Sequence, residues 1–480
     1  MANMKSLAKD TAIYGLSSIL GRFLNYCLVP LYTHCMPKES GDYGISTNMY
    51  AYTALILVIL TFGMETTVFR FANKDEYKPD TVFSTAFAWV FGLSALFMTA
   101  MFCFITPIAD VLKYSDHHEY LLMMAAVVTL DAIQALPFSF LRFQKRPLKF
   151  ATLKMLFIVF NIALNCLYFL VLGKTEVYYI FLINLWCTSA ITVFFIPDFL
   201  HIKWHFDGRL MLRMLGYSWP LLILGIAGIL NQTFDKMAYP LVADPADATQ
   251  QLGIYGACVK IAMIMAMITQ AFRYAYEPLV FSIAKDKDSK ETYALGMKYF
   301  LIFTLLAFLC VMGYLDILKL IIGNGYREGL RVVPIVMAAE IMMGVYFNLS
   351  FWYKLIDKTI YGAWFSLAGC TVLVAVNILF IPEYGYMACA WGGVAGYGTA
   401  MVLSYMVGQR KNPIAYPMKS IMAYVGITAL FFAIMQYVPT GWPLWCRLGI
   451  NTLLIILFVA HIIYHDMPLR SLPVVGKFFR

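Results

Sequence analysis

The chain has 480 residues, of which 61% are hydrophobic and 13% are charged. Ordinary soluble domains carry about 25% charged residues, so this composition excludes a soluble globular protein. The apolar runs are long and unbroken, which excludes a membrane β-barrel, whose strands of about ten residues alternate in polarity. We therefore predict an all-α polytopic membrane protein, in which each helix needs about 20 apolar residues to cross the bilayer.

Fourteen apolar segments are predicted to span the membrane. They begin near Thr11, Tyr43, Val82, Glu119, Leu148, Val177, Leu215, Leu252, Ala294, Gly329, Thr359, Gly385, Met418 and Leu444. The first segment follows a polar start with Lys5 and Lys9 and has no A-x-A cleavage site, so we expect it to remain as a span. The connections are too short to hold a folded domain. The activity is therefore expected at membrane depth.

The net charge of +9 reflects topology and does not indicate a nucleic-acid partner. With the N-terminus in the cytoplasm, most Lys and Arg residues outside the spans lie inside. About four lie outside, namely Lys38, Lys113, Lys174 and Arg327. This split and the even number of spans predict that both termini are cytoplasmic. The ten cysteines form no CxxC pair and mostly lie in apolar segments, so we interpret them as core residues.

A weak internal repeat relates the two halves of the chain. The motif GDYG at 41–44 matches GIYG at 253–256, and the same offset aligns Asn165 with Asn377. An even number of spans separates equivalent points, so both copies enter the membrane in the same direction, as in a parallel transporter repeat. The predicted parts are an N-terminal lobe of six spans at 1–205, a C-terminal lobe of six spans at 206–412, and a final pair at 413–480.

We single out four cations within the predicted spans, because a charge there costs about 2.5–3.5 kcal/mol on insertion scales. Arg22 is midway along the first span, Lys236 is in the seventh, and Lys260 and Arg273 are in the eighth. Arg22 is interpreted as lining a cavity or forming an internal ion pair. Arg273 lies near the cytoplasmic end of its span, so it either lines a cavity or extends its charge to the membrane surface.

Several acids also lie within the spans. Asp131 and Glu340 occupy similar depths in the two lobes, and Asp235 lies beside Lys236. A carboxylate at this depth either takes up a proton or sodium ion, as in a coupled carrier, or pairs with a neighbouring cation. Glu65 lies near the cytoplasmic face, where pairing with Arg70 would give it a structural role.

Motifs that would indicate an enzyme are absent. The sequence has no HExxH, G-x-S-x-G or ATP-binding signature, and the GKT at 173–175 lacks the earlier glycine of a phosphate loop. His117 and His118 lie in a turn without further spaced ligands, which does not predict a metal site. We therefore expect no catalytic residue, no cofactor and no metal.

Two segments carry a resemblance to a known family. The opening KDTAIYGLSSILGRFLNYCLVPLYTHCMPKESGDYG at 9–44 resembles the polysaccharide transporter family, the Wzx-type oligosaccharide flippases of the MOP superfamily. The later NILFIPEYGYMACAWGGVAGY at 377–397 is similar to the segment that this family carries between spans eleven and twelve. The resemblance extends over essentially the whole chain, including the arrangement of six, six and two spans.

The resemblance implies a flippase of the bacterial inner membrane with a V-shaped pair of lobes around a central cavity, and we expect it to be a monomer. Its substrate would be an undecaprenyl-diphosphate-linked oligosaccharide, moved from the inner to the outer leaflet by alternating access for O-antigen or capsule synthesis. Guanidinium and ammonium groups suit a lipid diphosphate, and the candidate ligands are Arg22, Lys260, Arg273 and Lys236. The candidates for proton or sodium coupling are Asp131, Glu340 and Asp235. The alternatives are a MATE-type exporter of organic cations, whose cavity should present acids, and a membrane glycolipid-processing enzyme.

Overall fold

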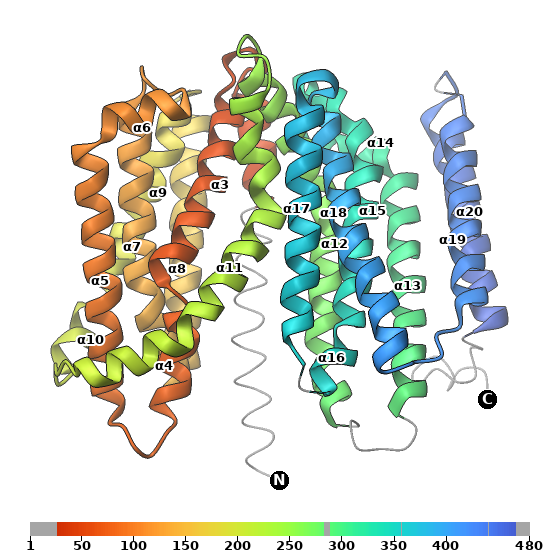
Figure 1. Cartoon of the computed structure of the whole chain (residues 1–480). Coiled ribbons are helices and arrows are strands. Elements are labelled where there is room, and N and C mark those ends of the chain that lie inside the picture. Colours follow the sequence, from red (N-terminus) through yellow and green to blue (C-terminus); the bar gives the residue numbers. More distant parts are fainter. Residues whose placement is uncertain (1–25, 283–288, 357, 440, 467–480) are drawn as a thin grey trace. The chain divides into compact units, whose positions relative to one another are not determined.

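The computed structural model describes residues 26–282, 289–356, 358–439 and 441–466, and these residues form helices and no strand (Figure 1). Helices account for 86% of the described residues. Lipid offers no partner to backbone polar groups, so a spanning segment must satisfy them within itself, as a helix does. The predicted all-α membrane fold is confirmed.

The helices follow one another with short connections. Those up to residue 282 are α2 (Leu28–Cys35), α3 (Asp42–Thr61), α4 (Met64–Ala72), α5 (Pro79–Cys103), α6 (Ile105–Leu112), α7 (His118–Phe143), α8 (Pro147–Cys166), α9 (Val177–Val193), α10 (Ile196–His201), α11 (Gly208–Val242) and α12 (Ala248–Ser282). The later helices are α13 (Ser289–Gly313), α14 (Leu315–Leu318), α15 (Val333–Leu349), α16 (Phe351–Leu355), α17 (Ile360–Tyr384), α18 (Tyr386–Lys411), α19 (Met418–Tyr437) and α20 (Leu444–His465). Short helical segments of other types are η1 (Lys38–Ser40), η2 (Leu167–Val171), η3 (Lys319–Ile321) and η4 (Asn324–Val332).

The observed helices agree with the predicted spans. Among the described residues, 12 helical segments are long and apolar enough to cross a membrane. The predicted span at Gly385 corresponds to α18, a helix of 26 residues that is not among these 12 segments and has a basic end. The predicted span at Thr11 falls mostly outside the described residues. The sequence placed the seventh span at Leu215, whereas α11 begins at Gly208.

The chain forms two compact units. Unit 1 comprises Met1–Ala257 and Val374–Cys389, and unit 2 comprises Cys258–Leu373 and Ala390–Arg480. Helices α12, α17 and α18 each contribute to both units. The seventh span, α11, packs against α3, α4 and α5 within unit 1. The lobe limits inferred from the repeat stay a prediction.

Unit 1 contains a bend in the second span. Helix α3 ends at Thr61, and Phe62 and Gly63 both adopt left-handed conformations with φ of 52° and 67° before α4 begins. Glycine tolerates positive φ without strain. A Cβ on Gly63 would also lie 3.0 Å from the Cβ of Leu221 on α11. The break therefore allows α3, α4 and α11 to pack closely.

The two copies of the repeat motif meet within unit 1. A Cβ on Gly44 in α3 would lie 1.7 Å from the carbonyl oxygen of Thr249 in α12. On the opposite helix, a Cβ on Gly256 would lie 2.6 Å from Oγ1 of Thr47. Small residues allow helix backbones in membranes to approach closely. The glycines of GDYG and GIYG therefore form one helix crossing.

The last two helices of unit 2 are fixed to α13 by polar contacts. At one end, Tyr424 of α19 and Lys298 of α13 both bond to the carboxylate of Asp466, which directly follows α20. At the other end, the amide of Asn451 in α20 donates to the carbonyl oxygen of Gly313 at 2.8 Å. These contacts make α13, α19 and α20 one packed group.

Candidate functional site

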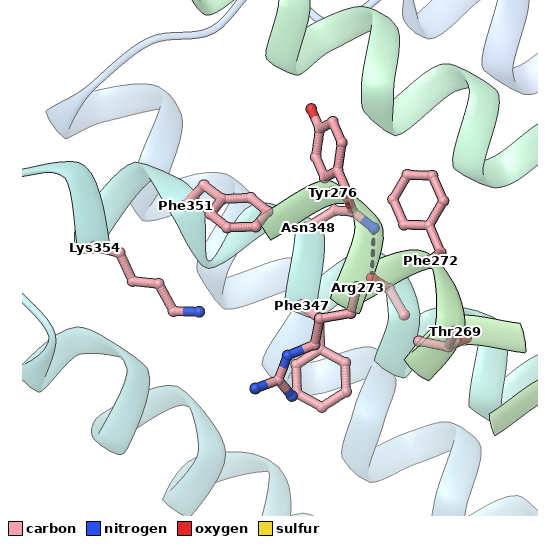
Figure 2. A pocket seen from close by; sticks show the side chains of 9 residues that line it. Thr269, Phe272, Arg273, Tyr276, Phe347, Asn348, Phe351 and Lys354 are labelled. Atoms are coloured by element: carbon pink, nitrogen blue, oxygen red, sulfur yellow. Dashed lines mark hydrogen bonds between the residues drawn. The ribbon is translucent and has the colours of Figure 1, made fainter. Parts of the chain in front are cut away.

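A pocket lies within unit 2 between α12 and the consecutive helices α15 and α16 (Figure 2). Its enclosed space is small, about 10 Å³. Its lining residues are Thr269, Phe272, Arg273, Tyr276, Gly344, Phe347, Asn348, Phe351 and Lys354. Among these nine residues there are two cations and no carboxylate. The pocket is therefore positively charged.

Both cations of the pocket lie over aromatic rings. The guanidinium carbon of Arg273 is 5.0 Å from the ring centroid of Phe347, and Nζ of Lys354 is 5.2 Å from the ring centroid of Phe351 (Figure 2). Attraction between a cation and the face of a ring helps to orient each side chain. Arg273 is exposed and Lys354 is partly exposed, so both charges remain accessible to an anion.

The pocket also contains two buried polar side chains, Thr269 and Asn348, which are 5% and 9% exposed. The amide nitrogen of Asn348 donates to the carbonyl oxygen of Gly344 at 3.0 Å. Among the residues that the structure describes, neither Oδ1 of Asn348 nor Oγ1 of Thr269 has a hydrogen-bond partner. A buried polar atom without a partner is unfavourable by about 1–3 kcal/mol. Both atoms are enclosed by the surrounding side chains.

Close aromatic packing holds the walls of the pocket in place. The ring of Phe272 is 4.9 Å from that of Phe300 and 5.0 Å from that of Tyr276, and Tyr276 in turn meets Phe351 at 5.7 Å. A Cβ on Gly344 would lie 2.3 Å from Cζ of Phe300. Only glycine fits at this position without moving the ring of Phe300, so this ring packs directly against the backbone of Gly344.

The pocket includes one of the four predicted cations. Arg273 lines it, whereas Lys260, thirteen residues earlier on α12, is partly buried and is not among the lining residues. Arg22 lies outside the described residues. The predicted acid Glu340 is partly buried on α15, the helix that contributes Asn348 to the pocket.

The predicted residues Asp235 and Lys236 contact each other in unit 1. Nζ of Lys236 lies 2.9 Å from Oδ2 of Asp235, and the hydroxyl of Tyr255 donates to the same oxygen at 2.6 Å. The side chains of Asp235 and Lys236 are only 12% and 19% exposed. The arrangement is an ion pair that joins α11 to α12 through Tyr255.

The predicted acid Asp131 is partly buried on α7. It interacts electrostatically with Lys154 on α8, a cation that the sequence analysis did not single out. Nζ of Lys154 lies 4.0 Å from the ring centroid of Phe138, which is about two helix turns beyond Asp131 on α7. The contact with the ring holds the cation against α7.

Glu65 pairs with a different arginine from the one predicted. Its carboxylate lies 3.4 Å from the guanidinium of Arg142 at the end of α7. The predicted partner Arg70 instead stacks on the ring of Tyr217, 4.1 Å from its centroid. Glu65 and Arg70 are on one helix, but Arg142 comes closer because α4 packs directly against α7.

Sequence reasoning missed three residues of the pocket: Thr269, Asn348 and Lys354. Thr269 and Asn348 are single neutral polar residues in apolar spans, a pattern too common to single out. Lys354 lies near the end of a span, where a lysine usually extends to the membrane surface. The sequence feature that could have drawn attention to Lys354 is the aromatic run FWY at 351–353, immediately before it.

Comparisons with known proteins agree with the fold. The profile of the family described as "Polysaccharide biosynthesis protein" matches residues 39–331. The structure is similar to the lipid II flippase MurJ in an inward closed conformation, with a TM-score of 0.75 and 13% identity over 94% of this chain and 98% of the other. No curated protein sequence matches the chain significantly.

Two multidrug transporters have a similar structure. An inward-facing MATE transporter of the MOP superfamily matches with a TM-score of 0.65 and 13% identity over 87% of this chain and 99% of the other. The MATE multidrug transporter DinF-BH matches with a TM-score of 0.60 and 15% identity over 84% of this chain and 96% of the other. At such identities the likeness shows the fold alone. The chain belongs to the polysaccharide biosynthesis protein family and has a helical membrane fold similar to those of a lipid II flippase and of MATE multidrug transporters.

Proposed function

We propose that the protein is a flippase for undecaprenyl-diphosphate-linked oligosaccharides in the bacterial inner membrane. It moves the repeat unit to the outer leaflet for synthesis of a surface polysaccharide such as O-antigen or capsule. The observation that carries the proposal is the pocket of unit 2, which presents Arg273 and Lys354 without a carboxylate among its lining residues. The family and the flippase-like fold support the same function.

The chemistry of the pocket suits a lipid phosphate. A guanidinium binds phosphate oxygens through two parallel hydrogen bonds, and an ammonium adds a second positive charge. Such contacts are stronger where apolar groups exclude water, and the rings of Phe347 and Phe351 lie against the two cations. In this mechanism the lipid tail stays in the bilayer while the sugars and diphosphate cross with the protein by alternating access.

The proposal also includes the other residues that the sequence indicated as ligands of the diphosphate or as sites of ion coupling. Arg22, Lys260 and Lys236 remain candidate ligands of the diphosphate along its path, although the ion pair with Asp235 makes Lys236 the weakest of them. Asp131, Glu340 and Asp235 remain candidates for coupling to protons or sodium ions. We propose a monomer without enzymatic activity or cofactor.

The main alternative is a MATE-type exporter of organic cations. The fold does not separate the two functions, since the chain resembles both a flippase and multidrug transporters. The charge of the pocket favours the flippase, because Arg273 and Lys354 would repel an organic cation. A glycolipid-processing enzyme is a weaker alternative, since the pocket presents no nucleophile paired with a base.

The proposal is tested by reconstituting the protein in liposomes that contain a fluorescent undecaprenyl-diphosphate oligosaccharide and measuring transfer between leaflets. We expect Arg273→Gln and Lys354→Gln each to lower the transfer rate about tenfold or more, the value of a charge-assisted hydrogen bond. The control is Lys419→Gln, at an exposed lysine outside the pocket. Equal rates for all variants, or export of organic cations without lipid transfer, would contradict the proposal.

A further inference from the structure

A strap of residues 194–219 connects the sixth span to the seventh within unit 1. It contains α10 and the first part of α11, which runs obliquely across the end of unit 1 at which α10 lies (Figure 1). Helix α11 has 35 residues, or about 50 Å of helix. A bilayer core of about 30 Å takes up about 26 of them even at a tilt of about 40°, the upper end of the usual range. The rest of α11 must lie outside the hydrocarbon core.

The excess length is at the beginning of α11. Arg209 and Arg213 lie in its first two turns, and charges are unfavourable in the hydrocarbon core. Pro220 then removes a backbone hydrogen bond, which allows the helix to bend. The charges nearest the other end, Asp235 and Lys236, neutralise each other as a buried pair. The place of the strap is therefore a membrane surface, and the distribution of Lys and Arg predicts the cytoplasmic one.

The inner side of the strap is docked on unit 1 by specific contacts. The carboxylate of Asp198 in α10 pairs with Lys149 at 2.5 Å and with Arg146 at 3.8 Å, both at the start of α8. Further along, the indole of Trp204 lies edge-on to Phe87 of α5, with 5.4 Å between the ring centroids. These contacts fix the strap in unit 1 and leave its other side facing outward.

The outer side of the strap is apolar and carries two unpaired cations. Its large apolar side chains, each at least 49% exposed, are Phe194, Ile196, Leu200, Phe206, Leu212 and Trp219. They continue the exposed apolar surface of the adjoining spans, as at Val193 and Ile223. Lys203 and Arg209 are exposed too, and neither forms an ion pair within the described part of the chain. Apolar and basic side chains together on one surface segment are typical of the membrane interface.

We propose that the strap is a binding site for anionic phospholipids of the membrane surface. Its apolar side chains enter the bilayer near the glycerol level, and Lys203 and Arg209 bind headgroup phosphates. One such cation near an anionic surface strengthens association about fivefold. A zwitterionic headgroup carries its own ammonium group, which offsets this attraction. The proposal does not depend on the transported substrate, because the pocket of unit 2 shares no residue with the strap.

Fluorescence quenching by brominated lipids measures the depth of the strap. In a cysteine-free full-length protein in liposomes, a fluorophore is attached to Leu200→Cys in the strap, Phe91→Cys at the middle of α5, or Asp75→Cys in an exposed loop. Bromine near the glycerol end of the acyl chain should quench the label at Leu200 most, and bromine near the methyl end that at Phe91. Neither should quench the label at Asp75. A label at Leu200 that behaves like the one at Asp75 would overturn the proposal and leave the strap open to a soluble partner.

Headgroup selection is tested at the same position. The measured quantity is the quenching of the Leu200 label by brominated phosphatidylglycerol divided by that by brominated phosphatidylcholine. We expect a ratio above one in the strap and a ratio of one at Phe91. Lys203→Gln combined with Arg209→Gln should lower the strap ratio about two- to fivefold. Lys419→Gln, at an exposed lysine of unit 2, should leave it unchanged. A strap ratio of one, or one that the double variant does not change, would contradict the headgroup site.

The chain with its own cysteines provides a second measurement. Electron spin resonance of spin-labelled phosphatidylglycerol and phosphatidylcholine gives the ratio of their association constants with the reconstituted protein. We expect the wild type to favour phosphatidylglycerol, and the variant that lacks Lys203 and Arg209 to favour it less. Equal selectivity of these two proteins would count against the proposal. The flippase proposal would still stand after such a failure, because neither measurement involves the transported lipid.

Discussion

Asp235 and Lys236 are adjacent in the sequence, and their charges neutralise each other inside unit 1. The carboxylate also accepts a hydrogen bond from Tyr255, so its oxygens are well satisfied. Removing one partner of a buried pair leaves an uncompensated charge, which is more costly than replacing both partners. The pair is therefore expected to stabilise the packing of α11 against α12.

This pair gives a prediction for stability. We expect Asp235→Ala to lower the free energy of unfolding by about 2–4 kcal/mol, because Lys236 and Tyr255 both lose their acceptor. The double variant with Lys236→Met should recover a large part of the loss. Thermal unfolding of the purified protein in detergent measures both effects. Asp75→Ala, at an exposed site, is the control. An unchanged midpoint for Asp235→Ala would contradict the pair's structural role.

Single residues differed in how far the sequence revealed them. Arg273 stood out because a charge within an apolar span is rare and requires a physical reason. Asn348 and Thr269 carry no such signal, because their importance depends on burial without a partner, which only the packing creates. Glu65 was correctly placed beside an arginine, but Arg142 and not Arg70 supplies it.

At the scale of helices, the crossing of α3 and α12 depends on glycine. The sequence analysis used GDYG and GIYG only as markers of a repeat. The structure brings the two motifs together, with Gly44 facing the backbone of Thr249 and Gly256 facing Thr47. A rigid backbone carbonyl cannot move aside as a flexible side chain can, so Gly44 is the more restrictive of the two.

Alanine substitutions at Gly44, in the crossing, and at Gly92, outside it, are expected to change the stability of the protein in opposite directions. Gly44→Ala should destabilise the protein by about 1–3 kcal/mol or more, because the added methyl group would overlap the backbone of α12. Gly92→Ala on α5, where no atom of another element in the described residues lies within 4 Å of the added carbon, should stabilise it by up to about 1 kcal/mol. Thermal unfolding in detergent compares them. Equal changes at both sites would show that the helices do not cross at Gly44.

Helix boundaries illustrate what local sequence specifies. The hydropathy pattern placed the start of the seventh span at Leu215, but α11 begins at Gly208, where the side chain of Asp207 caps it by accepting from two backbone N–H groups. The break at Phe62 and Gly63 was not predicted, since apolar residues continue through it. It depends on contact with Leu221 of α11, a residue far along the chain.

For the whole molecule, the distribution of Lys and Arg predicts cytoplasmic termini. In that topology Ser115 lies outside the membrane and Asp75 lies inside. In intact cells expressing a cysteine-free protein, we expect a membrane-impermeant maleimide to label Ser115→Cys. We expect it to label Asp75→Cys only after the membrane is permeabilised. Both residues are exposed, so access to the reagent depends on the side of the membrane. Labelling with the reverse pattern would invert the predicted topology.

The sequence by itself determined the class of protein, the all-α fold and the position of nearly every span. These follow from the length of apolar runs and from the need of each spanning segment to satisfy its own backbone polar groups, both of which are local properties. Only the tertiary structure decided which residues form the pocket. Arg273 and Lys354 lie on different helices, and packing of α12 against α15 and α16 brings them to one mouth above Thr269 and Asn348. Such long-range contacts depend on side-chain shape across helices, which hydropathy does not encode.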